Sequence, residues 1–225
     1  MGSYLNPGNK GFQESLNSEI YVDKTGLIEK TNEVLDTRQK FLCVSRPRRF
    51  GKSMAADMLA AYYERGEDSA ELFGTLKISK VESYEKNRNQ YDIIKVNMQE
   101  FLSMTHSMDE MLSMLQKYLI FDLTDHFDNV RFRDENNLIQ VMKDIYSKTK
   151  HSFVILIDEW DCLFREYQQD QEAQKKYLDF LRAWLKDKDY VALAYMTGIL
   201  PIKKYGSHSA LNMFTEYSMT DPGEL

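Results

Sequence analysis

Cysteine is nearly absent from this sequence of 225 residues. Its two cysteines, Cys43 and Cys162, do not form a CxxC pair. This disfavours a disulfide-based fold, and we expect two buried free thiols in a reducing compartment. Metal-ligand spacing is also missing among the histidines. We expect surface or capping positions for all four: His106, His126, His151 and His208.

Long apolar runs are missing as well. No run approaches the ~20 residues that a membrane-spanning helix requires, and residues 1–12 lack the apolar region of a signal peptide. The sequence therefore predicts no membrane partner and a cytoplasmic location. The net charge of −6 gives no general affinity for polyanions, so nucleic acid has no support as a partner beyond local basic patches.

Strand-like and helix-like segments alternate along the chain, without an internal repeat. Periodic apolar faces predict helices between five segments that predict strands: 41–44, 92–98, 153–157, 190–196 and 214–219. Residues 1–20 are rich in Asn, Gly and Ser, and we expect a loop there. The alternation predicts an α/β fold with a parallel sheet of about five strands.

The stretch from Phe41 to Met54, FLCVSRPRRFGKSM, has the order strand, loop, Gly-Lys-Ser and helix. This is the context of a phosphate-binding P-loop, where a helix N-terminus offers unpaired N–H groups and a positive dipole end. Lys52 is expected to reach the β- and γ-phosphates, and Ser53 to ligate Mg²⁺. The residues expected to contact the nucleotide are Arg49, Phe50, Gly51, Lys52, Ser53 and Met54.

Arg46 stands where the general P-loop pattern has its first glycine. For this stretch alone, a strand-to-helix turn with a basic N-terminus is therefore the alternative. Arg49 lies close to the Gly-Lys-Ser turn, so it is the arginine expected to contact phosphate. Arg46 and Arg48 are expected to be structural or to face a partner.

Asp158 and Glu159 follow the densest apolar run of the chain. Asp158 is predicted to hold Mg²⁺ together with Ser53. Glu159 is predicted to orient and deprotonate the water that attacks the γ-phosphate. The alternative for these two acids is a solvated turn at a strand end. A third acid, Asp161, is expected to cap a helix.

Thr197 ends the next predicted strand, where a polar side chain can sense the γ-phosphate; a simple strand-to-loop hydroxyl is the alternative. Some P-loop ATPases carry the catalytic Glu on the second motif strand, which is 153–157 in this chain. ATPases of that type have one further strand between the two motif strands. Here that strand is 190–196, which gives the order 5-1-4-3-2. Ligands of parallel sheets bind beyond the carboxyl ends of the strands. We therefore expect Ser45, Asp158 and Thr197 to converge there.

These stretches together resemble the predicted AAA-ATPase-like family of bacterial and archaeal proteins. The similarity spans nearly the whole chain, and an arginine at the first glycine position is usual in that family. Its motifs in this sequence are YVDKT at 21–25, SRPRRFGKS at 45–53, ELF at 71–73, LKI at 76–78, IDEWD at 157–161 and TGI at 197–199.

The resemblance implies one ATP-binding domain over residues 1–225, a three-layer P-loop NTPase sandwich on which residues 1–36 pack. Family members commonly carry a C-terminal lid and a PD-(D/E)XK-type nuclease-like domain. We expect this chain to include neither. AAA-type turnover usually needs an arginine from a neighbouring subunit, which makes a homo-oligomer a candidate assembly.

The predicted function is Mg²⁺-dependent ATP hydrolysis that drives or gates an attached domain. Glu159, Lys52 and Thr197 are the expected catalytic residues. The alternative is a nucleotide-gated switch or interaction module with little turnover, which Arg46 and the missing lid motivate. A P-loop kinase is disfavoured by a Glu directly after the strand Asp.

Overall fold

The computed structural model describes residues 2–202 and 210–218. Its centre is a parallel sheet with the spatial order β2-β3-β4-β1-β5. Read from the β5 edge, this is the order 5-1-4-3-2 that the sequence predicts. The strands are β1 (Phe41–Ser45), β2 (Asp92–Asn97), β3 (Phe153–Asp158), β4 (Val191–Gly198) and β5 (Thr215–Tyr217). The predicted last strand extended to Met219, which lies outside the described residues.

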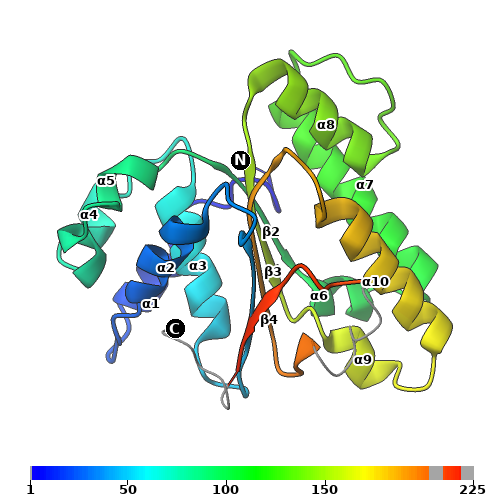
Figure 1. Cartoon of the computed structure of the whole chain (residues 1–225), viewed down its shortest axis with the longest axis horizontal. Coiled ribbons are helices and arrows are strands. Elements are labelled where there is room, and N and C mark those ends of the chain that lie inside the picture. The colour runs from blue at the N-terminus through cyan, green and yellow to red at the C-terminus, as the bar shows by residue number, and fades with distance from the viewer. Residues whose placement is uncertain (1, 203–209, 219–225) are drawn as a thin grey trace.

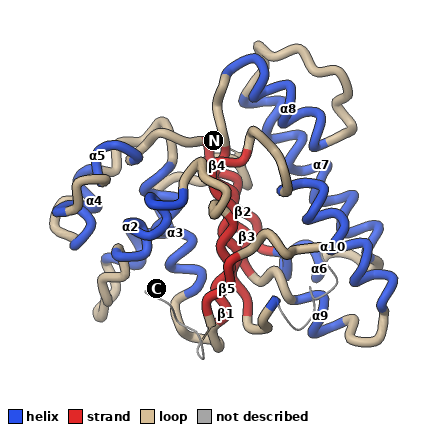
Figure 2. Tube along the Cα trace, viewed as in Figure 1, coloured by secondary structure: helices blue, strands red, loops and turns tan. Residues whose placement is uncertain are grey.

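Helices cover both faces of the sheet, so the fold is a three-layer α/β sandwich (Figures 1 and 2). One layer contains α1 (Lys10–Leu16), α2 (Gly26–Val34), α3 (Lys52–Tyr63), α4 (Ala70–Phe73), η1 (Lys77–Lys80) and α5 (Tyr84–Asn87). The other contains α6 (Met98–Ser103), α7 (Met108–His126), α8 (Leu138–Thr149), α9 (Cys162–Glu166) and α10 (Gln171–Leu185). Within the described ranges, no helix has the length and apolar character needed to cross a membrane.

Side-chain alternation along the strands produces two apolar cores. In β3, Val154 and Leu156 join the core under α3, whereas Ile155 and Ile157 join the core under α7 and α10. All six residues of β3 are buried, which explains why the five before Asp158 form an unbroken apolar run. Because both faces are covered, the strand ends are the part of the sheet that is open to chemistry.

Both cysteines are free and buried, as the sequence predicts. Cys43 lies in β1, and Cys162 is the first residue of α9. Burial raises the pKa of the Cys43 thiol well above its ordinary value and raises the pKa of Cys162 to about 12. Neither thiol is therefore primed for nucleophilic chemistry.

The expectation that residues 1–20 form only a loop is wrong. Residues 10–16 form α1, which packs on α3. Phe12 of this helix stacks on Phe73 with ring centroids 4.8 Å apart. A seven-residue helix that buries only Phe12 and Ser15 gives too short an apolar pattern to be recognised in a polar stretch.

The residues before α1 cover the outer edge of β2. Leu5 forms an antiparallel bridge with Ile94. The Asn6 N–H donates to the Ile93 carbonyl at 2.8 Å, and the Asn6 amide donates to Asp92 Oδ1 at 3.0 Å. This pairing occupies backbone groups that an edge strand otherwise exposes.

Two histidines lie beside the buried carboxylate of Asp92. They are expected at the surface, and both do contact this acid. His151 Nδ1 lies 3.0 Å from Asp92 Oδ2, and His126 Nε2 lies 4.0 Å from Oδ1. Arg65 Nε is 3.8 Å from the same carboxylate. His208 lies outside the described residues.

Glu64 anchors the N-terminal segment from the end of α3. Its buried carboxylate accepts a hydrogen bond from the Gly8 N–H at 2.7 Å. Burial raises the pKa of Glu64 from its ordinary 4.5 to about 7. The folded state therefore favours the protonated carboxyl. The resulting stabilisation is complete below pH 4.5 and is lost as the pH rises through about 7.

We expect Glu64→Gln to reduce this pH dependence. The amide still accepts the Gly8 N–H, but it has no charge to bury at high pH. Between about pH 5 and pH 8, the free energy of unfolding should fall by roughly 2 kcal/mol less in the variant, since one pKa unit corresponds to ~1.4 kcal/mol. Urea denaturation at both pH values measures this, with exposed Glu82→Gln as control. Equal pH dependence in Glu64→Gln and wild type would contradict the prediction.

Candidate functional site

The loop of residues 46–51 connects β1 to α3 at the carboxyl end of the sheet. Gly51 is the residue before the helix and has a φ of +74°, a left-handed conformation that glycine adopts without strain. Arg49 has a φ of +70°. The first turn of α3 contains no acidic residue, so its unpaired N–H groups retain their attraction for anions.

Arg46 shows how this loop forms without glycine at its first position. Its N–H donates to the Gly198 carbonyl at 3.0 Å and continues the pairing of β1 with β4. Its φ is not positive, so the backbone here does not require glycine. The guanidinium donates to the Ser45 carbonyl at 3.3 Å, which is a structural contact.

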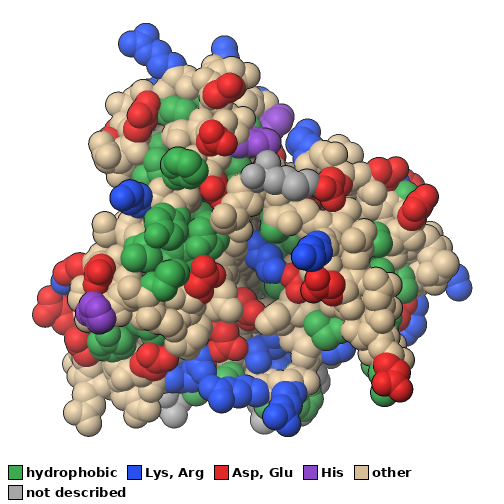
Figure 3. Space-filling view, turned by 180° about the vertical axis from the view of Figure 1, so that it is seen from behind, with side chains coloured by type: hydrophobic (Ala, Val, Ile, Leu, Met, Phe, Trp, Pro, Cys, Tyr) green, Lys and Arg blue, Asp and Glu red, His purple; other side chains and the backbone are tan. Residues whose placement is uncertain are grey.

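The remaining loop side chains are largely exposed. Phe50 and Met54 expose 48% and 39% of their surface. Arg48 and Arg49 are also exposed, and no ion pair joins either of them to an acid among the described residues. Lys and Arg side chains gather at the lower end of the molecule, where β1 enters the loop (Figures 1 and 3).

Lys52 is buried at the start of α3. It is 8% exposed, and its Nζ donates to the Pro47 carbonyl at 3.2 Å. The ammonium therefore lies across the inside of the loop, close to the free N–H groups of the helix. A cation in this place adds to the helix dipole.

Two hydroxyl groups converge on Asp158, the last residue of β3. Ser53 Oγ donates to Asp158 Oδ2 at 2.5 Å. Thr197 Oγ1 donates to Asp158 Oδ1. The carboxylate is 4% exposed, so both of its oxygens are held in place. Asp158 and Thr197 meet as the expected convergence of strand ends requires. Ser45, the third residue expected there, instead donates its hydroxyl to the Leu200 carbonyl at 3.1 Å.

Glu159 is held differently from its neighbour. It has a left-handed φ of +53°, and its N–H donates to Asp158 Oδ1 at 3.0 Å. Its carboxylate Oε2 accepts a hydrogen bond from Arg165 Nη2 of α9. Among the described residues, no hydrogen bond joins this carboxylate to Lys52, Ser53 or Thr197.

Asp161 occupies the position before α9, but the expectation that its side chain caps a helix is wrong. Asp161 Oδ2 accepts hydrogen bonds from the N–H groups of Ile199 and Leu200, at 3.0 and 2.8 Å. The carboxylate fixes the segment that follows β4.

A pocket of about 410 Å³ opens beside the loop, between α2, α3 and the sheet. Asp23 is the acid of its described lining, and its oxygens already accept bonds from Thr25 and the Lys77 N–H. The pocket therefore presents net positive charge and apolar walls. Its cations are Lys24, Arg46, Lys52 and Lys77, and its apolar lining includes Leu27, Val44, Ala55 and Tyr195.

Lys24 is a site residue that sequence reasoning missed. Its Nζ donates to the Phe50 carbonyl at 2.9 Å, and a Cβ on Gly51 would lie 2.9 Å from this nitrogen. The turn that carries Lys24 is tied to η1, because the Ile78 N–H donates to Thr25 Oγ1 at 3.1 Å. The YVDKT stretch was the available signal, but it indicated only a resemblance.

A model of the family described as predicted AAA-ATPase (AAA-ATPase_like) matches residues 8–207. The chain belongs to this family. The matched segment contains the loop, Asp158 and Thr197, so the whole candidate site lies inside the AAA-ATPase-like region.

A curated relative is 24% identical over 212 residues. It is described as "Uncharacterized protein in vnfD 5'region", from Azotobacter chroococcum mcd 1. The alignment covers 88% of this chain and 37% of the relative. This AAA-ATPase-like chain thus spans little more than a third of that protein's length.

The donor atoms of the AAA-ATPase-like site suit a hard cation. Ser53 Oγ and the Asp158 carboxylate are oxygen ligands of the kind that Mg²⁺ prefers. Among the described residues, no group of three or more His, Cys, Asp or Glu is arranged so that it could hold a metal ion by itself. A cation bound here needs further oxygens from phosphate and water, which is how Mg²⁺ binds at nucleotide sites. The residues present therefore fit Mg²⁺ bound together with a nucleotide.

Proposed function

We propose that the chain binds ATP with Mg²⁺ and hydrolyses it. The convergence of Ser53 and Thr197 on Asp158 carries this proposal. In P-loop enzymes, a serine after the loop lysine and an aspartate at a strand end hold the metal. Here both stand beside a glycine turn, a buried lysine and an open helix N-terminus.

Binding of the triphosphate would use groups that are already in place. The N–H groups at the start of α3 and the Lys52 ammonium would contact the β- and γ-phosphates. Lys24 adds a second cation at the Phe50–Gly51 peptide. The adjoining pocket would take the nucleoside, with its apolar walls against the base.

Hydrolysis would divide the work among four side chains. Asp158 and Ser53 would hold Mg²⁺, which neutralises charge on the β- and γ-phosphates when bound. Thr197 fixes one oxygen of Asp158 and would sense the terminal phosphate. Glu159 would accept the proton of the attacking water. The attached domain that turnover would drive, and assembly as a homo-oligomer, belong to the proposal as well.

Calorimetric titration with ATP, with and without Mg²⁺, tests this function. Mg²⁺ should strengthen ATP binding to the wild type. In Ser53→Ala, ATP should still bind, but the Mg²⁺ enhancement should fall by roughly tenfold, which corresponds to ~1.4 kcal/mol for one lost ligand. Ser18→Ala, which removes an exposed hydroxyl bonded to Glu14, is the matched control. An undiminished enhancement in Ser53→Ala would remove Ser53 from the metal site.

The second candidate function is a nucleotide-gated switch with little turnover. The ion pair between Arg165 and Glu159 favours it, because the residue proposed as base is already engaged. A sensitive phosphate-release assay discriminates the two functions, since a switch would bind ATP without steady release of phosphate.

A further inference from the structure

Arg165 of α9 lies between two acids of the turn that follows β3. Its Nη2 donates to Glu159 Oε2, and its Nε is 3.6 Å from Asp161 Oδ2. The side chains of Arg165, Glu159 and Asp161 are 20%, 22% and 0% exposed. The cluster is therefore sheltered, and solvent ions screen it less than a surface ion pair.

The pairing affects the chemistry proposed for Glu159. The guanidinium holds Oε2 of the carboxylate on the α9 side, so Glu159 cannot turn its carboxylate toward an attacking water while this bond persists. Arginine stays protonated at every working pH, so Arg165 cannot release Glu159 by losing its proton. Release requires the guanidinium to move to another acceptor.

Asp161 is the other acid beside Arg165. Asp161 Oδ1 and Arg165 Nε are both buried, and neither has a hydrogen-bond partner in the part of the chain that the structure describes. Arg165 Nε lies 3.6 Å from Asp161 Oδ2, an ion pair without a hydrogen bond, so the nitrogen and the Oδ1 atom both have bonding capacity left. A small shift would let the guanidinium bond Asp161 in place of Glu159, because arginine and carboxylate form paired hydrogen bonds readily.

The segment after β4 is mechanically linked to this pair. The N–H groups of Ile199 and Leu200 bind Asp161. A Cβ added at Gly198 would lie 2.7 Å from Asp161 Oδ1 and from the Trp160 ring. The strand that carries Thr197 therefore cannot shift at its end without displacing Asp161, and Asp161 faces Arg165.

We propose that Arg165 is a latch on Glu159. It is a positioning residue: in this structure it holds the Glu159 carboxylate, and movement of the Gly198–Leu200 segment transfers the guanidinium to Asp161. Glu159 is then free to accept the proton of the attacking water. This inference rests on the proposed ATP hydrolysis.

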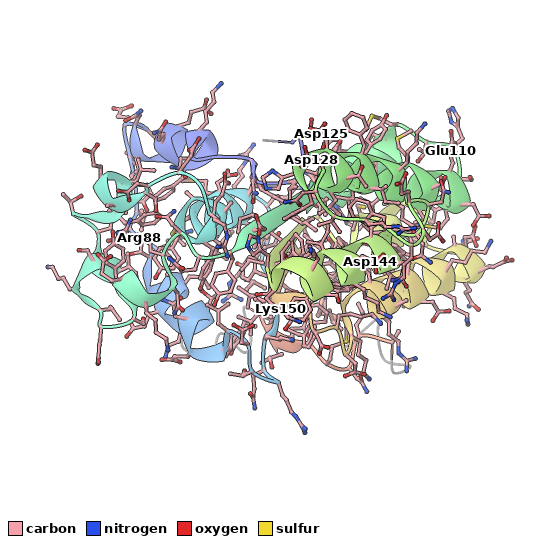
Figure 4. All side chains as sticks on the ribbon, turned by 90° about the horizontal axis from the view of Figure 1, so that it is seen from above. Arg88, Glu110, Asp125, Asp128, Asp144 and Lys150 are labelled. Atoms are coloured by element: carbon pink, nitrogen blue, oxygen red, sulfur yellow. The ribbon has the colours of Figure 1, made fainter. Side chains whose placement is uncertain are left out.

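Arg165→Gln tests the latch in a steady-state ATPase assay. The variant should raise kcat roughly tenfold, a lower bound for losing a hydrogen bond to a charged group, and should leave the KM for MgATP unchanged. Arg165→Lys keeps the charge and should give a smaller rise. Arg88→Gln is the matched control, because it breaks the ion pairs of Arg88 with Asp68 and Glu85 on the α5 side (Figure 4). Its kcat should equal that of the wild type.

An Arg165→Gln kcat at or below that of the wild type, with MgATP still bound, overturns the latch. The latch is also overturned if both the wild type and Arg165→Gln bind MgATP without hydrolysing it. If Arg165→Gln does not fold, Arg165→Lys decides: a rise supports the latch, and no rise overturns it.

Failure of the proposed function gives a different result, namely no heat of ATP binding in the wild type. The ion pair is then tested by melting temperatures of Arg165→Gln, Glu159→Gln and the double variant. Losses that are not additive support the pairing of the two side chains, and additive losses overturn it.

Discussion

Replacing Lys52 with alanine should abolish measurable MgATP binding. The Lys52 ammonium lies inside the loop, 3.2 Å from the Pro47 carbonyl, and would contact two phosphates. Each hydrogen bond to a charged group is worth roughly 1.5–3 kcal/mol, so losing two of them should weaken binding by about a hundredfold or more. Isothermal titration calorimetry measures the loss.

The control for Lys52→Ala is Lys143→Ala, which removes an exposed lysine of α8. Its MgATP affinity should match that of the wild type. Melting temperatures of both variants should be recorded, because Lys52 also braces the loop in the absence of nucleotide. An unchanged affinity in a folded Lys52→Ala variant would exclude this loop as the nucleotide site.

The second large effect is expected for Glu159→Gln. Glutamine has nearly the same shape, so MgATP binding should be preserved. It cannot accept a proton from water as a carboxylate does, and general bases contribute about 10²- to 10⁴-fold to rates. Phosphate release should fall by that factor, and the loss is measured most clearly in the Arg165→Gln background, where the latch is absent.

The matched control is Glu166→Gln, which changes the exposed acid next to Arg165. It accepts a hydrogen bond from Gln99 of α6. Unaltered turnover in Glu159→Gln would assign the proton to another acceptor. Lost turnover in both variants would instead indicate that α9 as a whole had been disturbed.

The core of the site was predictable because strand ends have a fixed direction. Once 41–44, 153–157 and 190–196 are interpreted as parallel strands, their ends are expected at one edge of the sheet, which brings Ser53, Asp158 and Thr197 close together. The hydrogen bonds to Asp158 show that meeting, while the catalytic roles of these residues stay predictions. The strand order was also predictable, since the two motif strands needed one strand between them.

Contacts made by side chains across tertiary structure were not predictable. Lys24 reaches Phe50 over 26 residues, and Asp161 reaches the segment after β4 over 38. Glu159 and Arg165 are six residues apart, which is no helical spacing, because Glu159 lies in the turn before α9. No local pattern marks such pairs.

The prediction of a loop at residues 10–16 failed for another reason. The stability of α1 comes from Phe12 packing between α3 and the α4 region, not from the helix's own sequence. The N-terminal segment likewise gains its order from the β2 edge and from Glu64, which composition alone does not reveal.

The two buried cysteines can serve as native probes of local opening around the site. Cys43 lies two residues before the end of β1, and Cys162 lies three residues after Glu159. Both thiols are protonated and shielded in the native state, so an alkylating reagent labels them only when the sheet end or α9 opens. Mass spectrometry of the labelling rate therefore reads the mobility of both sides of the site without an engineered probe. Any ligand that braces these strand ends registers as protection of native thiols.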